Sequence, residues 1–189
     1  ALIAGRNSNS FTDKSAELFN PATGTWALTG TPNTTRQGYV ATVLPNGKVL
    51  IAGGYPAPGG NLNTAELYDP IAGTWAYTAN NMTAERGVPA AVLLTSGPNA
   101  GKVLVIGGHN DINGVLASAE LYNPAPGTWA STGSMSSARA AFTATVLTNG
   151  KGLVVGNGYG TSFAAAELYN PDTGAWTSTG SMTTARGTH

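Results

Sequence analysis

Short runs of Val, Ile, Leu, Thr, Tyr and Trp alternate with clusters of Gly, Pro and Asn along the whole chain. The pattern is clearest in one stretch, where four such runs cover residues 38–44, 48–54, 64–69 and 73–78. The runs are too short for helices, and their β-branched and aromatic residues are typical of strands separated by tight turns. The pattern therefore predicts an all-β protein.

One phrase recurs four times, as AELFNPATGTW, AELYDPIAGTW, AELYNPAPGTW and AELYNPDTGAW. The tryptophans that end these phrases are 49, 54 and 47 residues apart. A period of about 50 residues is typical of supersecondary units stacked in an array. We therefore predict a single repeat domain over residues 1–189, with units at approximately 1–37, 38–87, 88–138 and 139–189.

Turn residues indicate how the strands of one unit connect. Asn46-Gly47 and Asn149-Gly150 lie between the first and second runs, and Asn-Gly favours a type I′ hairpin turn. The segment Asn20 to Gly24 combines a proline with a glycine and is expected to close a second hairpin onto the tryptophan strand. Four antiparallel strands with near-continuous apolar runs predict a sheet that is covered on both faces, as in a propeller blade.

The order of the repeated features resembles the kelch repeat over the whole chain. A double glycine follows an apolar strand, an aromatic residue ends the third strand, and the spaced tryptophan follows; the glycine pairs are Gly53-Gly54 and Gly107-Gly108, and the aromatics Tyr68, Tyr122 and Tyr169. The resemblance implies a kelch-type β-propeller of four-stranded antiparallel blades, with the glycine pair ending the second strand and the tryptophan in the fourth. Gly5-Arg6 and Gly156-Asn157 depart from the glycine pair, and we expect these departures to perturb a turn and not the fold.

The number of units differs from that of the resembling family, whose propellers usually close with six or seven blades. The chain has about four blades, with four second, third and tryptophan strands but only three complete first strands. We expect it to be a segment of a larger propeller. The alternative is that several copies associate through exposed blade edges, because unpaired edge strands invite partners.

Residues that repeat in register are expected to serve the architecture. Glutamates and arginines recur together in the four units, at Glu17, Glu66, Glu120 and Glu167 and at Arg36, Arg86, Arg139 and Arg186. Such residues can pair within or between blades. The tryptophans Trp26, Trp75, Trp129 and Trp176 are expected in the core, and Met82, Met135 and Met182 between blades.

Residues that do not repeat are candidates for function. The loops between the second and third strands differ in every unit and are expected to lie on the same face as the arginine loops. Loops on a rigid scaffold commonly carry recognition residues. The candidate binding residues are Arg6, Tyr55, His109, Asp111, Tyr159 and Phe163, and the alternative is that they belong to ordinary exposed loops.

Signals for catalysis, metals and cofactors are weak. The chain has no cysteine, and His109 and Asp111 have only one other histidine to join them, at the terminus. The segment from Asn110 to Gly114 faintly resembles a calcium loop, but it lacks the acidic partners, and Asn-Gly turn chemistry explains it better. We therefore predict no catalytic residue, no metal site and no cofactor.

Charge and hydropathy exclude two classes of partner. Only 10% of the residues are charged and the net charge is zero, so a nucleic-acid partner is not expected. No apolar run approaches the roughly 20 residues that span a bilayer, and the first residues have no signal-peptide anatomy. The composition is similar to that of secreted or periplasmic bacterial proteins, so we expect an extracellular or periplasmic location.

These observations favour a non-enzymatic binding module, a scaffold that presents its variable loops to a protein or glycan partner. One alternative is a structural component that self-associates through blade edges. A second alternative is a fragment of a carbohydrate-active kelch enzyme. Some kelch relatives are enzymes: copper oxidases that resemble galactose oxidase, and sugar epimerases. The copper oxidases need a cysteine-modified tyrosine, which a chain without cysteine cannot supply.

Overall fold

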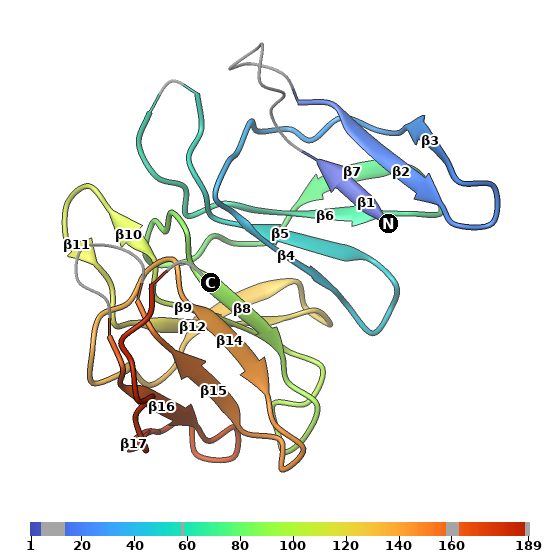
Figure 1. Ribbon diagram of the computed structural model, residues 1–189. Helices are drawn as coiled ribbons and strands as arrows, with labels where there is room; N and C mark the ends of the chain where they lie inside the picture. The colour runs from blue at the N-terminus through green and yellow to red at the C-terminus, as the bar shows by residue number, and fades with distance from the viewer. Residues whose placement is uncertain (5–13, 58, 158–162, 188–189) are drawn as a thin grey trace.

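The computed structural model describes residues 1–4, 14–57, 59–157 and 163–187, and these residues form strands, turns and loops without a helix (Figure 1). None of the described residues therefore forms a helix that could cross a membrane. The strands are β1 (Leu2–Ala4), β2 (Ala16–Asn20), β3 (Thr25–Leu28), β4 (Val40–Val43), β5 (Val49–Ala52), β6 (Ala65–Asp69), β7 (Thr74–Tyr77), β8 (Ala90–Leu93), β9 (Val103–Ile106), β10 (His109–Asn110), β11 (Gly114–Val115), β12 (Ala119–Asn123), β13 (Thr128–Ser131), β14 (Thr143–Val146), β15 (Gly152–Val155), β16 (Ala166–Tyr169) and β17 (Trp176–Thr179).

The strands form successive antiparallel sheets that follow one another along the chain (Figure 1). The first blade is three-stranded, in the order β1-β2-β3. The second, third and fourth blades are four-stranded, in the orders β4-β5-β6-β7, β8-β9-β12-β13 and β14-β15-β16-β17. A two-stranded ribbon, β10-β11, projects from the third blade. The prediction of all-β, four-stranded antiparallel blades is confirmed.

The first hairpin of the second blade has the predicted antiparallel pairing but not the predicted turn. Leu44 N donates to Lys48 O at 2.8 Å and Gly47 N donates to Leu44 O at 2.9 Å, so three residues lie in the loop. Gly47 has φ 82°, whereas Asn46 is not among the residues with positive φ. This is a type I turn followed by a left-handed glycine, and the prediction of a type I′ turn is wrong because a three-residue loop needs only one left-handed position.

Apolar residues from facing sheets fill the spaces between the blades. One cluster joins the second and third blades and contains Leu50, Met82 and Tyr122. Another joins the third and fourth blades and contains Leu104 and Met135. The two methionines therefore lie between blades, as predicted, and the third blade buries one face on the second blade and the other on the fourth.

The tryptophans differ in burial according to the position of their blade in the array. Trp129 of the third blade is 6% exposed, whereas Trp26 of the first blade is 46% exposed. Trp26 still packs on Phe19 with ring centroids 5.0 Å apart, as Trp75 packs on Tyr68. The expectation of a core position is therefore confirmed for Trp129 and wrong for Trp26, whose outer side is not covered by another blade of the described residues.

Polar contacts at the rim of the blade interfaces follow a common pattern with one exception. The hydroxyls of Tyr68 and Thr29 share a hydrogen bond of 2.5 Å, and those of Tyr169 and Thr132 one of 2.9 Å. At the interface of the second and third blades, the hydroxyl of Tyr122 is buried and has no hydrogen-bond partner among the described residues. Burial raises the pKa of this phenol.

A longer connection explains the exception. The segment between Trp75 and Arg86 is one residue longer than its counterparts, and Ala79 takes the place of a glycine. The indole N–H of Trp129 donates to Thr78 Oγ1 at 3.3 Å instead of to a backbone carbonyl. Because Thr78 also donates to Asn80 O at 2.8 Å, its hydroxyl is engaged elsewhere and does not reach Tyr122.

Candidate binding face

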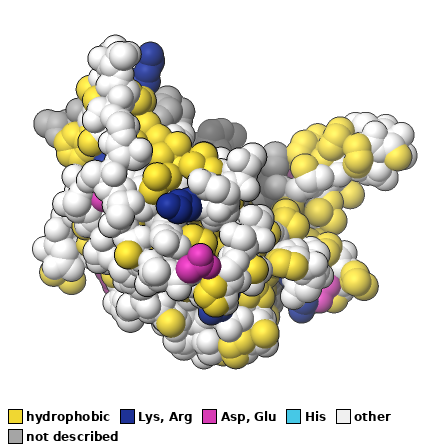
Figure 2. Space-filling model, turned by 90° about the horizontal axis from the view of Figure 1, so that it is seen from below, with side chains coloured by type: hydrophobic (Ala, Val, Ile, Leu, Met, Phe, Trp, Pro, Cys, Tyr) yellow, Lys and Arg dark blue, Asp and Glu magenta, His cyan; other side chains and the backbone are white. Residues whose placement is uncertain are grey.

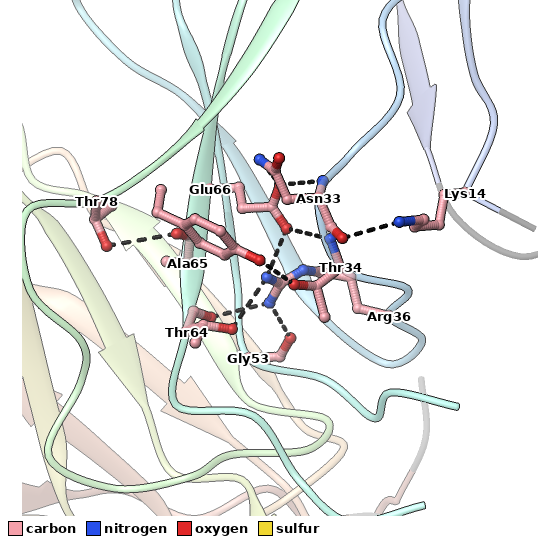
Figure 3. A network of polar contacts seen from close by, with 10 residues as sticks. Lys14, Asn33, Thr34, Arg36, Gly53, Thr64, Ala65, Glu66 and Thr78 are labelled. Atoms are coloured by element: carbon pink, nitrogen blue, oxygen red, sulfur yellow. Dashed lines mark hydrogen bonds and ion pairs between the residues drawn. The ribbon is translucent and has the colours of Figure 1, made fainter. Parts of the chain in front are cut away.

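The arginines that follow the tryptophan strands fix the linkers between blades. In Figure 3, Arg36 donates to Gly53 O and Thr64 O, both at 2.9 Å, and forms an ion pair with Glu66 at 2.9 Å. Glu66 also accepts a hydrogen bond of 2.7 Å from Asn33 N. The side chains of Arg36 and Glu66 are 1% and 0% exposed, so the linker before the second blade is held by a buried, hydrogen-bonded charge pair.

The same arrangement, which we call the arginine clasp, recurs in the third and fourth blades. Arg86 pairs with Glu120 at 3.0 Å, and Arg139 pairs with Glu167 at 3.2 Å. Burial acts to raise the pKa of Glu167, but hydrogen bonds from Ser136 and the neighbouring Arg139 outweigh it and hold the pKa below its ordinary value. The predicted pairing is confirmed, and its repetition assigns these residues to the architecture.

The clasps also anchor the variable loops. Gly54 N donates to Arg86 O at 2.7 Å, Gly108 N donates to Arg139 O at 2.8 Å, and Asn157 N donates to Arg186 O at 3.1 Å. The loops after β5, β9 and β15 therefore start beside the arginine linkers, as predicted. We call the surface formed by these linkers and the described parts of loops 53–64, 107–118 and 156–165 the loop face; β10-β11 lies in the second of these loops (Figure 1).

Tyr55 is half-buried at the base of the first of these loops. Its backbone bridges to Gln37, and its ring lies over the backbone of Gly87. A Cβ atom placed on Gly87 would lie 2.2 Å from Cζ of Tyr55, so only glycine permits this close approach. The ring therefore stabilises the linker between the second and third blades.

The backbone of His109 pairs with the same glycine. Gly87 N donates to His109 O and His109 N donates to Gly87 O, each at 2.8 Å. The structure thus brings Tyr55 and His109 together at Gly87, although 54 positions separate them in the sequence. His109 is half-buried, and its backbone begins the β10-β11 ribbon.

The ribbon carries Asp111 at an exposed tip. The Oδ1 atom of Asn110, a residue only 3% exposed, accepts hydrogen bonds from Ile112 N at 3.1 Å and Asn113 N at 2.6 Å. Asn110 also donates to Glu85 O at 3.4 Å, which ties the ribbon to the neighbouring linker. The tip is therefore held in one conformation while the side chain of Ile112 remains 84% exposed.

Phe163 is the candidate contributed by the fourth blade. The guanidinium carbon of Arg139 lies 5.7 Å from the centroid of its ring, within the range of a cation–π contact. Its backbone bridges to Arg186. Phe163 is half-buried and supports a clasp, while Arg6 and Tyr159 lie outside the described residues.

Comparison with known proteins identifies the repeats. The family model described as "Kelch motif" matches residues 38–82 and 95–136. The chain carries kelch repeats. A solved structure entitled "Structure of YjhT" superposes with a TM-score of 0.75 at 14% sequence identity. The similarity covers 92% of this chain and 64% of that chain, so the present chain spans less than two thirds of the solved protein. No curated protein sequence matches.

At this level of identity, the structural match establishes the fold, a kelch-type β-propeller, and nothing about ligands. Within the part of the kelch chain that the structure describes, no group of three or more His, Cys, Asp or Glu side chains is arranged to hold a metal ion. In the segment that faintly resembles a calcium loop, the oxygen of Asn110 accepts backbone N–H groups, as in an Asx turn.

Sequence reasoning did not select two features of the kelch loop face. Ile112 is an exposed aliphatic residue in an otherwise polar tip. In the sequence, an isoleucine between Asp111 and Asn113 was the one sign that could have identified it. Val88 adopts a left-handed conformation with φ 42°, which is uncommon for a β-branched residue. It occupies the place of Gly38 in the previous unit, and Val88 N donates to Gly38 O at 2.8 Å.

Proposed function

We propose that this kelch protein is a non-enzymatic binding module whose partner docks on the loop face. The observation that carries the proposal is the tip of the β10-β11 ribbon, where the buried Asn110 fixes the backbone beneath an exposed Asp111 and Ile112. A tip that is ordered before binding loses little conformational entropy on association. Exposed aliphatic residues are otherwise unfavourable in water, so a partner that covers Ile112 gains free energy from its burial.

The chemistry of the tip favours a protein partner. An aliphatic side chain next to a carboxylate is complementary to an apolar pocket flanked by a basic or amide group. Glycans are bound chiefly by exposed aromatic faces and polar groups, whereas the ring of Tyr55 packs on Gly87. A peptide or protein surface is therefore our first choice, and a glycan ligand is the other outcome that the experiment distinguishes.

The two ends of the blades support the choice of face. Opposite the loop face, the turns between the last two strands of each blade are short and alike. They are the β2-β3, β6-β7, β12-β13 and β16-β17 turns. Each contains a glycine of nearly equal φ, at 69° for Gly24, 66° for Gly73, 71° for Gly127 and 70° for Gly174. The loop face differs from blade to blade. Recognition of one particular partner requires such differences, because a repeated surface presents the same contacts several times.

Matched isoleucines test the proposal. Peptides selected from a displayed random library against the purified chain are expected to bind Ile112→Ser at least about 10-fold more weakly than the wild type, because burial of an isoleucine is worth about 1.5–3 kcal/mol. Ile71, 98% exposed in the β6-β7 turn, provides the control, and Ile71→Ser should bind normally. Equal effects of the two substitutions, or selection of glycans but no peptide, would contradict the proposal.

The location outside the cytoplasm, in the extracellular or periplasmic space, is also a proposal. It is supported by the low charge content and by the abundance of Gly, Ser, Thr and Asn. Detection of the protein by antibody in the cytoplasmic fraction alone would contradict it.

A further inference from the structure

The first hairpins of the four-stranded blades differ in length at the end of the blades opposite the loop face. Counted between their closing backbone hydrogen bonds, the β4-β5 and β14-β15 hairpins have three loop residues each, 45–47 and 148–150. The β8-β9 hairpin of the third blade has seven, 95–101. The extra residues of this loop extend toward the fourth blade.

The long β8-β9 loop fills the groove between the third and fourth blades. Asn99 Nδ2 donates to Pro171 O in the β16-β17 turn at 2.7 Å. A Cβ atom placed on Gly150 would overlap Oγ of Ser96, so the loop also packs closely on the β14-β15 turn, beside which it lies in Figure 1. Pro171 and Gly150 are both buried. One blade therefore provides a short peptide segment that occupies a groove on the next blade.

The equivalent groove between the second and third blades is open. The shorter β4-β5 turn leaves a cavity of about 330 Å³, whose lining includes Pro45 of that turn and Gly101 and Pro124 of the third blade. In the repeat, Gly101 and Pro124 correspond to Gly150 and Pro171, but they are half-buried instead of buried. We call this cavity the open groove. Its two blades each have a neighbouring blade of this chain on the other side, so it is an internal feature of the array.

The packing around Gly101 shows how much looser the open groove is. A Cβ atom placed on Gly101 would have only Cγ of Pro45 within 4 Å, at 3.8 Å, which is an ordinary van der Waals distance. The equivalent atom on Gly150 would have no room, because Ser96 occupies the space. A segment of the size that fills one groove is therefore missing from the other.

The filled groove indicates which chemistry the open groove fits. Residues 96–99, Ser-Gly-Pro-Asn, are small or turn-forming, and the carboxamide of Asn99 provides the donor for a proline carbonyl. Pro124 O is the equivalent acceptor in the open groove. Lys102 is the one charged residue among the described residues that line this groove, and charged side chains are also sparse on the surface shown in Figure 2. An uncharged turn segment with an amide side chain is therefore complementary to it.

We infer that the open groove is a docking site for an exposed turn of a partner protein, with small residues between the two blades and an asparagine carboxamide that donates to Pro124 O. The volume of the groove lies within the range of about 300–1,000 Å³ found for ligand sites. The β8-β9 loop of a second copy of this chain is already packed on its own fourth blade, so the occupant is a different protein. This site is separate from the loop face and does not depend on the function proposed for it.

A cyclic peptide tests the inference. A peptide with the sequence of residues 95–101, closed by a terminal disulfide, presents the loop without its blade, and the protein has no cysteine to exchange with it. In NMR titrations of the isotope-labelled chain, the amide signals of Gly101, Lys102 and Ala125 should shift with a dissociation constant of about 1 mM or lower. Replacing the asparagine of the peptide with alanine should weaken binding about 5-fold or more, because the donor to Pro124 O is lost.

Matched alanines provide the control. Ala125 lines the open groove, and Ala125→Trp should weaken binding of the cyclic peptide about 10-fold or more by placing a large ring there. Ala22 is also exposed and holds the same position in the β2-β3 turn, so Ala22→Trp should bind normally. Grafting the 95–101 sequence in place of residues 45–47 should fill the groove and abolish binding.

Three results would overturn the inference. They are the absence of shifts at peptide concentrations up to about 10 mM, shifts that are not centred on the residues of the open groove, and equal effects of the two tryptophan substitutions. Ile112→Ser, on the loop face, should leave binding of the cyclic peptide unchanged. Failure of this inference and failure of the proposed function are therefore distinguishable.

Discussion

The clearest prediction concerns the phenol of Tyr122. The longer segment between Trp75 and Arg86 leaves it without a hydrogen-bond partner among the described residues. Tyr169→Phe removes one half of a hydrogen bond of 2.9 Å and leaves the hydroxyl of Thr132 without it. This change should lower the free energy of unfolding by about 1 kcal/mol. Tyr122→Phe removes a buried hydroxyl that makes no hydrogen bond among the described residues, and a buried unpaired polar group costs about 1–3 kcal/mol. We therefore expect Tyr122→Phe to be neutral or to raise stability by up to about 1 kcal/mol.

Urea unfolding followed by tryptophan fluorescence measures both variants, because Trp129 and Trp176 each contact one of the two tyrosines. Both substitutions remove the same atom from equivalent positions, so each is the control for the other. Loss of stability in Tyr122→Phe equal to that in Tyr169→Phe would show that the hydroxyl of Tyr122 is paired, and would refute the argument from the longer connection.

Three further predictions follow from the clasps and the loop glycines. Arg86→Met should lower the free energy of unfolding by about 3–5 kcal/mol because it leaves Glu120 buried without its partner, whereas Arg186→Met, which removes an exposed side chain, should change it by less than about 0.5 kcal/mol; chemical denaturation compares them. Gly107→Ala should cost about 2 kcal/mol more than Gly114→Ala, since both glycines have positive φ but only at Gly107 would a Cβ lie 2.3 Å from a backbone oxygen; thermal unfolding measures the difference. Because the pKa of Glu167 is lowered on folding, its contribution is complete above its ordinary value of 4.5 and is lost as the pH falls through the lower folded value; acid titration of stability should therefore be less steep below pH 4.5 in Glu167→Gln than in the wild type.

Much of the fold could be predicted because the same pattern of strand-forming runs, turn residues and charged residues recurs in each repeat unit. Strands β4 to β7 fall inside the four runs of the second unit, and the side chains of Arg36 and Glu66 meet as their recurrence indicated. The turn at Asn46 was predicted wrongly because a dipeptide preference does not include loop length. Asn157 replaces a left-handed glycine without changing the sheet, as expected, and its Oδ1 accepts Ala140 N at 2.8 Å.

The candidate site was harder to predict because exposure depends on neighbours in other blades. Tyr55 follows a glycine pair and has the features of a loop residue, but its ring packs on Gly87 of the next linker. Ile112 has no repeat partner, and only the fixed ribbon makes its exposure significant. Trp26 repeats in sequence with the buried Trp129, and its exposure follows from its place in the array, which no local pattern contains.

The central claim is that the arginine clasp fixes the linkers between blades and supports the loop face. A double-mutant cycle with Arg86→Met, Glu120→Gln and the double variant measures it directly by chemical denaturation. We predict a coupling free energy of about 2 kcal/mol or more, because each single substitution leaves the other buried group without its partner. A coupling below about 0.5 kcal/mol, the level found for independent sites, would contradict the account.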